Sequence, residues 1–151
     1  MKYLTALCII LVCFTKTNAN ENELVVYTSR KEHLIKPLFD QYTLMTGIKV
    51  NYRTGKDGVL IQALKSEGEN TPADILMTVD AGNLWYAKSQ GLFSKVNSPK
   101  LSNNIPAHLR DSDSNWFALS IRARTIVYHS ERVKEDELQS YESLADKKFK
   151  N

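Results

Sequence analysis

From residue 24 onward, short apolar runs alternate with amphipathic stretches. The runs at 24–28 and 75–79 are typical of buried strands, and the alternating residues 48–52 are typical of a half-buried one. Apolar residues between these runs recur at helical spacing, most clearly at Leu34, Ile35, Leu38, Phe39, Tyr42 and Met45. This alternation predicts right-handed crossover units and an α/β fold with a parallel sheet. The third strand, apolar on both faces, is expected to be central.

Polar residues and proline give the predicted starts of the helices. Ser29 followed by Glu32 has the spacing of a capping box. Pro37 is expected to kink the first turns or to move the helix start toward itself. Asp57 and Asp80 are expected to cap the second and third helices, which turn apolar faces inward. Those faces are Val59, Leu60, Ala63 and Leu64, then Leu84, Trp85 and Ala87, and the glycines expected to end the helices are Gly47, Gly68 and Gly91.

The hydrophobic pattern weakens in the second half of the chain. Residues 94–115 are rich in Ser, Asn, Pro and Asp, and they predict a surface loop with at most one short turn. The segments 116–121 and 125–128 look extended, and 135–144 is expected to hold a short helix. The charged run 146–151 has no element to pack over it. We interpret this ending as truncation rather than as a natural solvated tail.

The N-terminal residues predict an export signal. A positive start, an apolar run at 4–14 and small residues up to Ala19 fit a signal peptide over 1–19 that is cut after Ala19. The run is too short for a transmembrane helix, which needs about 20 apolar residues. Cys8 and Cys13 lie inside the leader, and neither follows the small residue that lipidation needs. We therefore expect an exported, periplasmic protein whose mature chain has no cysteine.

Composition and missing motifs narrow the classes of function. Loss of Lys2 and Lys16 with the leader lowers the formal net charge of +3 by two, and the remaining charges are interspersed. Nucleic-acid binding therefore has little support. The sequence has no Gly-x-Ser-x-Gly elbow, no phosphate-binding glycine loop and no His-Glu-x-x-His motif. A secreted enzyme remains an alternative without a motif in its favour, and we expect a protein that is not an enzyme.

Nine short phrases, matched in order and spacing over essentially the whole mature chain, carry a resemblance to a known family. They are VYTSR at 26–30, TGIKV at 46–50, TPADIL at 71–76, VDAGNLW at 79–85, QGLF at 90–93, IPAHLR at 105–110, WFALS at 116–120, RARTIVY at 122–128 and YESLAD at 141–146. Together they resemble the ferric iron-binding proteins of the bacterial periplasm. These are solute-binding components of ABC transporters with the type II periplasmic binding fold.

The resemblance implies a fold of two α/β lobes that close on a solute. Residues 20–121 would form most of the first lobe, around a parallel or mixed sheet. Residues 122–151 would supply a strand at 122–128 that crosses between the lobes, and the start of a second lobe that is incomplete here. The implied function is capture of Fe3+ by a monomeric protein, which delivers it to the permease of an inner-membrane ABC transporter. Fe3+ would then be cargo, and no catalytic cofactor is expected.

Candidate iron ligands follow from the same resemblance. Ferric iron is a hard cation that favours anionic oxygen, and the family supplies two adjacent tyrosines. This sequence has no Tyr-Tyr pair, so those ligands are expected beyond Asn151. The family often has His or Tyr where Lys31 and Glu32 stand here. Glu32 is either a direct ligand or only a helix-capping residue, and His33 is either a ligand or a surface histidine.

Basic residues are candidates for holding an anion beside the iron. Arg122 and Arg124 match a paired-arginine motif of the family, and Arg122 is expected to face the cleft, where it would bind a tyrosinate or a synergistic anion such as carbonate. Arg30 is interpreted in the same way as Arg122. For each of these arginines the alternative is a surface salt bridge, and for Arg124 we favour that alternative. Lys31 would hold an anion or be solvated.

Two other functions stay open at the level of sequence. One is a binding protein of the same fold for another small solute, such as thiamine, a phosphonate or another anion, since arginines and helix N-termini suit anions without a metal. The other is a non-functional fragment. A Tyr-Tyr pair encoded downstream would favour iron, and its absence would favour an anion.

Overall fold

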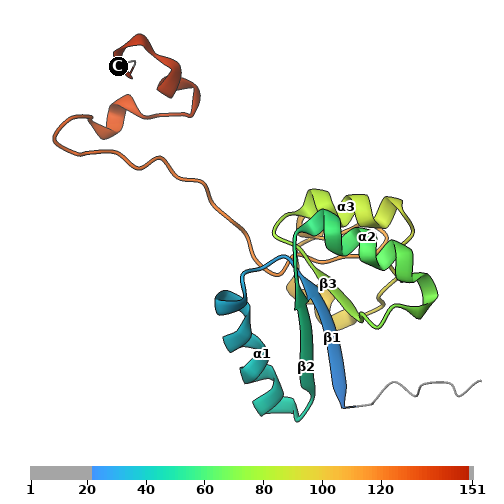
Figure 1. Ribbon diagram of the computed structural model, residues 1–151. Coiled ribbons are helices and arrows are strands. Elements are labelled where there is room, and N and C mark those ends of the chain that lie inside the picture. Colours follow the sequence, from blue (N-terminus) through green and yellow to red (C-terminus); the bar gives the residue numbers. More distant parts are fainter. Residues whose placement is uncertain (1–21, 150–151) are drawn as a thin grey trace, which may run out of the picture.

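A computed structural model describes residues 22–149, so the predicted signal peptide with Cys8 and Cys13 lies outside the described residues. Three parallel strands form one sheet in the order β2-β1-β3, and a helix follows each strand (Figure 1). The strands are β1 (Glu23–Thr28), β2 (Lys49–Thr54) and β3 (Ile75–Met77), and the helices are α1 (Glu32–Thr46), α2 (Asp57–Glu67) and α3 (Ala81–Ser89). The predicted α/β fold with a parallel sheet is confirmed.

The core lies on both faces of β1, because successive side chains of a strand point to opposite faces. Val26 packs with Ile35 and Phe39 of α1 on one face. On the other face, the neighbouring Tyr27 packs with Leu60 and Leu64 of α2. Strand β1 therefore carries one helix on each side, which explains why it reads as a continuous apolar run.

The predicted capping box at the start of α1 is wrong. The helix begins at Glu32, its N-cap is Lys31, and no side chain caps it. Ser29 instead continues the sheet, because its N–H donates to the carbonyl of Met77 at 3.0 Å. Pro37 does not move the helix start, which lies five residues before it. Pairing with β3 holds the chain extended past Ser29, and this overrides the local capping signal.

Other helix boundaries divide between confirmed and wrong predictions. Asp80 caps α3, since its Oδ1 accepts a hydrogen bond from the N–H of Asn83 at 3.1 Å. Asp57 is not a cap: Lys56 is the N-cap of α2, and Asp57 is the first helical residue. Gly47 ends α1 in the left-handed region, with φ at 76°. Gly68 follows α2 as predicted, and α3 ends at Ser89, two residues before Gly91, with Gln90 as its C-cap.

The strand at the centre of the sheet is β1, so the prediction of a central third strand is wrong. β3 pairs only with β1 among the described residues, and Ile75 is 42% exposed. Several residues predicted to point inward are also exposed. Trp85 is 65% exposed although Ala87 of the same helix is buried, and the α1 stripe is covered only in part. Its exposed members are Leu34, Leu38, Tyr42 and Met45.

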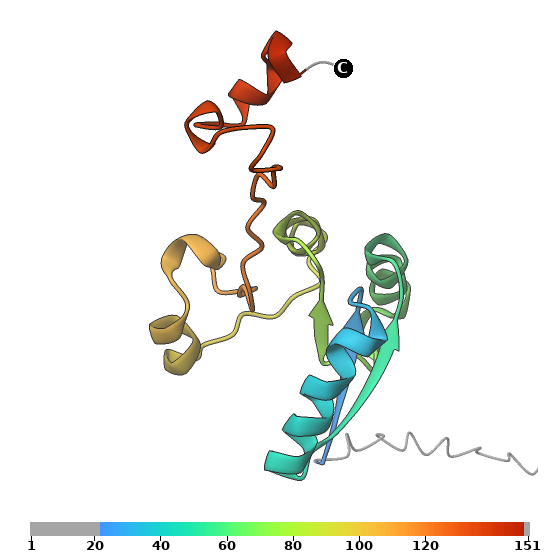
Figure 2. The ribbon, with the colours of Figure 1, turned by 90° about the vertical axis from the view of Figure 1, so that its left-hand side faces the viewer.

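The second half of the chain contains little regular structure. Helix α4 (Pro99–Asn104) lies in the predicted loop, and Arg110 forms an antiparallel bridge with Phe117. Residues 121–129 pair with no strand of the described chain, and the segment after them extends away from the sheet (Figures 1 and 2). In place of the helix predicted at 135–144 there are short 3₁₀ turns, as expected where a short helix lacks a packing surface. No helix within 22–149 is long and apolar enough to span a membrane.

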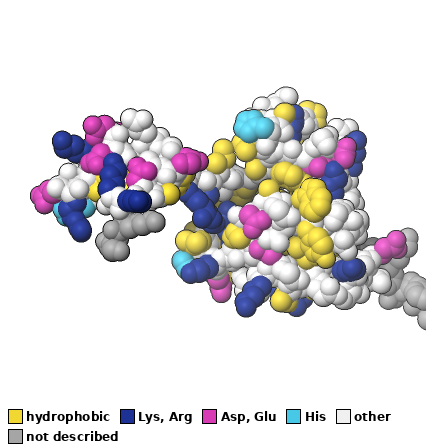
Figure 3. Space-filling view, turned by 90° about the horizontal axis from the view of Figure 1, so that it is seen from above, with side chains coloured by type: hydrophobic (Ala, Val, Ile, Leu, Met, Phe, Trp, Pro, Cys, Tyr) yellow, Lys and Arg dark blue, Asp and Glu magenta, His cyan; other side chains and the backbone are white. Residues whose placement is uncertain are grey.

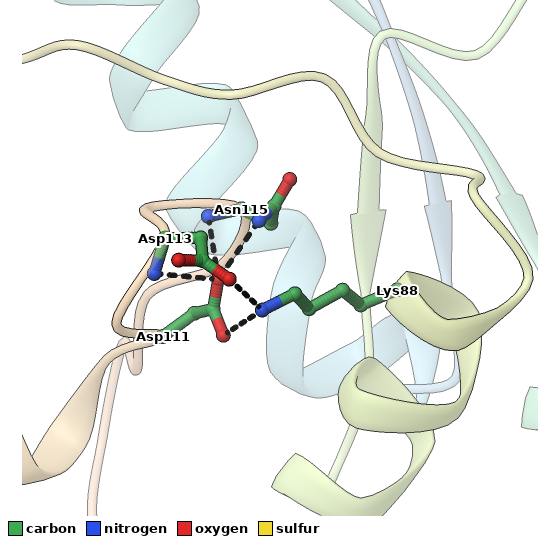
Figure 4. A network of polar contacts seen from close by, with 4 residues as sticks. All are labelled: Lys88, Asp111, Asp113 and Asn115. Carbon is green, nitrogen blue, oxygen red and sulfur yellow. Dashed lines mark hydrogen bonds and ion pairs between the residues drawn. The ribbon is translucent and has the colours of Figure 1, made fainter.

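A polar network ties the turn at 111–115 to α3 (Figure 4). Lys88 donates to Asp111 and Asp113, with both Nζ to oxygen distances at 2.7 Å. Asp111 is 9% exposed, and its other oxygen accepts from the main chain of Asp113 and from both N–H groups of Asn115. Burial disfavours the charged carboxylate, but hydrogen bonds from Lys88 and Asn115 outweigh it and lower the pKa of Asp111 from 3.8 to about 2.

The first prediction concerns the core under β1. Leu60→Ala should lower the free energy of unfolding by about 3 kcal/mol, because Leu60 is fully buried and its truncation leaves a cavity. Val59→Ala on the same helix should change it by less than about 0.5 kcal/mol, because Val59 is 56% exposed. Urea unfolding followed by circular dichroism measures both. Equal losses in the two variants would contradict this packing.

The second prediction concerns acid. The pKa of Asp111 is lower in the folded chain than in the unfolded chain, so its stabilising contribution is complete above pH of about 4 and is lost as the pH falls toward 2. Asp111→Asn should therefore be less stable than the wild type at pH 7 and approach it at pH 3. Guanidinium unfolding at both pH values gives the two differences. A gap that stays constant between pH 7 and pH 3 would contradict the assignment.

Candidate functional site

A cavity of about 520 Å³ lies along the outer edge of β3, and 116–122 lines it from the other side. Its inner wall runs from Ile75 through Ala81 and Leu84, and its outer wall contains Trp116 and Phe117. The cavity therefore extends past the carboxyl end of β3, where open α/β sheets bind ligands. Figure 3 shows hydrophobic side chains beside Lys and Arg side chains where the C-terminal segment leaves the lobe.

The charged residues that line the cavity are mostly cationic. They are Arg30, Arg122 and Arg124, with Asp80 as the carboxylate and His108 as the titratable imidazole. Within 22–149, none of the three arginines forms an ion pair. Guanidinium groups bind carboxylate, phosphate and other oxyanions, often through two parallel hydrogen bonds. This wall can therefore hold an anion, or an anionic ligand of a cation.

The position of Arg30 follows from the end of β1. Thr28 is fully buried, and its hydroxyl accepts a hydrogen bond from the main-chain N–H of Arg30 at 3.1 Å. The guanidinium of Arg30 then donates to the hydroxyl of Ser120 at 3.3 Å across the cavity. The end of β1 thus directs Arg30 toward the outer wall, although Arg30 and Ser120 are far apart in sequence.

A second polar group lies where α2 and α3 begin. The side-chain amide of Asn83 donates to Asp57 at 3.0 Å and to Asp80 at 3.1 Å, and so joins the two helix starts. The other oxygen of Asp57 and the hydroxyl of Ser29 are buried and find no hydrogen-bond partner within the described part of the chain. Both are oxygen atoms that can coordinate a cation, and both lie near the carboxyl ends of the strands.

The outer edge of β3 adds main-chain groups to the cavity wall. The carbonyl of Met77 points toward β1, where it accepts from Ser29. Because neighbouring residues of a strand direct their main-chain groups to opposite sides, those of Leu76 point to the outer edge. No strand within 22–149 pairs with that edge. The wall can therefore bind a polar ligand or accept a further strand.

The structure places the proposed ligands at the start of α1 outside this cavity. Lys31, Glu32 and His33 are exposed, and none of them lines it. Glu32 instead accepts a hydrogen bond from the hydroxyl of Tyr52 at 2.9 Å. That bond to Glu32, together with burial, raises the pKa of Tyr52, so it disfavours a tyrosinate there. No group of three His, Cys, Asp or Glu side chains suited to a metal occurs within 22–149.

Of the residues singled out in the sequence, Arg30, Arg122 and Asp80 thus come together, and Lys31, Glu32 and His33 do not join them. Arg124 also lines the cavity. His108, Trp116 and Ser120 line it as well, and sequence reasoning did not assign them to the site. Each lies in a segment without hydrophobic periodicity, so no periodic pattern predicts that it lines a cavity. All three lie within the matched phrases at 105–110 and 116–120, which were the one signal that could have found them.

Comparisons with known proteins found similar sequences and structures, although no family model matches the chain. The chain is 44% identical over 134 residues to iron uptake protein A1 of Synechocystis, covering 89% of this chain and 37% of that protein. It resembles a solved Trichodesmium structure described as IdiA or FutA in complex with iron and citrate ligands. The TM-score is 0.75 and the identity 45%, over 85% of this chain and 40% of that one.

A third similar protein is the ferric binding protein from Campylobacter jejuni, with a TM-score of 0.74 and 42% identity over 84% of this chain and 40% of that one. The chain therefore spans about two-fifths of the length of the proteins that it matches. These proteins are named for binding and uptake rather than for catalysis. Over the part that aligns, the chain is similar in sequence and in fold to the periplasmic ferric iron-binding proteins.

Proposed function

We propose that the protein is the substrate-binding component of an iron(III) ABC transporter, and that it captures Fe3+ in the periplasm. The observation that carries this proposal is the cavity at the carboxyl end of β3, in a fold whose similar structures include one in complex with iron and citrate. Residues 20–121 would be most of one lobe, and 122–151 a crossing segment with the start of a second. The protein would act as a monomer and deliver iron to an inner-membrane permease.

The proposed mechanism is capture without bond chemistry. Ferric iron favours anionic oxygen, so carboxylates, tyrosinates or a bound anion such as carbonate would hold it. Arg30 and Arg122 would neutralise that anion from the cavity wall. A cation bridging ligands from two lobes favours the closed state, because it has more contacts there than in the open one. Glu32 can join the ligands only if it gives up its hydrogen bond with Tyr52.

A small oxyanion such as a phosphonate is the second candidate for the solute. The observation in its favour is the charge of the cavity, where three arginines face one aspartate without ion pairs among the described residues. The same charge argues against thiamine, which is a cation. Fe3+ with a synergistic anion needs oxygen ligands for the metal in addition to the arginines. An anion alone needs only the arginines.

The third prediction is that the 151-residue chain binds Fe3+ weakly, with a dissociation constant above about 1 µM, or less than about 8 kcal/mol of binding free energy. The reason is that no group of three His, Cys, Asp or Glu side chains suited to a metal occurs within 22–149, and that the expected Tyr-Tyr pair is absent from the sequence. Titration with ferric citrate should quench the fluorescence of Trp116, which lines the cavity. Trp116→Phe should lose this response, and Trp85→Phe, which changes an exposed residue, should keep it.

Tight binding of Fe3+ by this chain, with the colour of a tyrosinate-iron complex, would contradict the weak-binding prediction. A chimera tests the function itself: residues 22–149 replace the aligned part of the ferric binding protein from Campylobacter jejuni. We expect the folded chimera to bind Fe3+ more tightly than the isolated chain, measured by bound iron after dialysis. A folded chimera that binds 2-aminoethylphosphonate and no iron would overturn the iron proposal in favour of the anion.

The fourth prediction concerns the arginines. Arg122→Gln in the chimera should weaken Fe3+ binding about tenfold in the presence of bicarbonate, since a charge-assisted hydrogen bond contributes about 1.5–3 kcal/mol. Without bicarbonate the difference should shrink, because the arginine would then have no anion to hold. Arg132→Gln is the matched control, since Arg132 is exposed and does not line the cavity. Isothermal titration of the unchanged chimera and both variants, with and without bicarbonate, measures these losses, and an equal loss for Arg122→Gln under both conditions would reject the anion role.

A further inference from the structure

The two walls of the cavity come from separate parts of the chain. The inner wall belongs to β3 and the start of α3, and the outer wall belongs to the segment from His108 to Arg122. Side chains connect the outer segment to the lobe at two places: Arg30 donates to Ser120, and Lys88 donates to the turn at 111–115. The width of the cavity therefore depends on how these contacts hold the outer wall.

The contact of Lys88 is the more constrained of the two. Its ammonium group lies 2.7 Å from an oxygen of Asp111 and 2.7 Å from an oxygen of Asp113, and the Lys88 side chain is 28% exposed. The Arg30 contact is a single hydrogen bond of 3.3 Å to a neutral hydroxyl. Charge-assisted hydrogen bonds are shorter and stronger than neutral ones. Lys88 thus supplies the strongest side-chain contact to the outer wall within 22–149, beside the main-chain N–H of Val96, which donates to the carbonyl of Ser114 in the same turn at 2.9 Å.

The turn that Lys88 holds is connected by its own hydrogen bonds and by one to the cavity wall. One oxygen of Asp111 accepts three hydrogen bonds from Asp113 and Asn115, which fix the turn internally. The main-chain N–H of Asp111 also donates to the carbonyl of Trp116 at 3.0 Å. Trp116 is the first cavity residue after the turn. A displacement of Asp111 therefore displaces Trp116.

Helix α3 connects the anchor to the inner wall. Leu84 lines the cavity, and Lys88 lies four residues further along the same helix, so the two side chains share one face of α3. Lys88 itself does not line the cavity. The helix therefore presents an apolar contact to the cavity and, one turn later, a cation to the opposite wall.

We propose that Lys88 is a positioning residue that sets the width of the cavity by holding the 111–115 turn against α3. It acts on ligand affinity through Trp116 and the segment after it, without touching the ligand. The effect on geometry needs only the contacts described above. The effect on affinity rests on the proposed function of the cavity as the ligand site.

The test compares Lys88→Met with two matched variants. Lys88→Arg keeps the cation and can donate to both carboxylates. It should therefore keep the wild-type distance distribution and the wild-type affinity. Lys36→Met removes the lysine of another close ion pair, to Asp40 at 2.6 Å, on the exposed surface of α1 far from the cavity lining. Nitroxide labels at Gln62→Cys on α2 and at Ala107→Cys, one residue before the outer segment, report the distance between the lobe and that segment, in the full chain with Cys8 and Cys13 replaced by serine.

Lys88→Met should give a longer and broader distribution of distances between the labels, and Lys88→Arg and Lys36→Met should match the wild type. In the chimera described above, Lys88→Met should weaken ferric citrate binding about tenfold while Lys88→Arg binds like the wild type. Asp113→Asn provides a second route, because Asp113 is exposed and its replacement should leave the folded chain intact. It should broaden the distribution less than Lys88→Met.

An unchanged distance distribution in Lys88→Met and Asp113→Asn would overturn the proposal, whatever the affinity. A changed distribution with no binding of ferric citrate by the wild-type chimera would support the positioning role and reject iron as the solute. A changed distribution with unchanged affinity would overturn the coupling of Lys88 to the ligand. The label distances and the binding data thus separate the two proposals.

Discussion

Pairing of β1 on both edges is the constraint on which the rest of the structure depends. β2 and β3 bind its two sides in parallel, and side chains from its two faces form the two apolar clusters of the core. The carboxyl ends of all three strands consequently lie at one edge of the sheet. That edge carries Thr28, the Asp57–Asn83–Asp80 hydrogen bonds and the mouth of the cavity. Stability and a place for a ligand therefore have the same origin.

The outer wall of the cavity depends on a different kind of interaction. Few apolar side chains of 107–122 are buried, so polar contacts hold this segment in place. Asp111 makes the main polar side-chain contacts, since it is nearly buried yet kept charged by Lys88 and Asn115. An ion pair of this kind contributes little net stability where it replaces well-packed apolar groups, but it specifies one geometry. In this protein the specified geometry is the position of Trp116 opposite β3.

The charge of the cavity is consistent with half of an iron site. Arginines at the wall suit an anion or anionic ligands, whereas a hard trivalent cation also needs oxygen donors around it. The described residues supply the arginines, and no group of three His, Cys, Asp or Glu side chains suited to a metal occurs among them. Since the chain spans about two-fifths of the proteins that it matches, the proposed mechanism places the remaining donors on a second lobe.

The sequence by itself determined the order of strands and helices, the parallel sheet and the family resemblance. The order of elements and the parallel sheet follow from local periodicity, as in the run around Val26 and the alternation around Val50. The resemblance rests on the nine matched phrases. It also indicated Arg30 and Arg122, through motifs that carry the resemblance. Local signals failed where long-range pairing competed with them, as at Ser29, whose capping pattern loses to the hydrogen bond with Met77.

Only the tertiary structure decided which residues share the cavity. His108, Trp116 and Ser120 line one cavity with β3, next to the turn where Lys88 and Asp111, distant in sequence, meet across the fold. Glu32, chosen from its place beside the strand end, turns to Tyr52 instead. The physical reason is that periodicity records which face of an element is buried, whereas a site is made by contacts between elements, and those depend on how the whole chain packs.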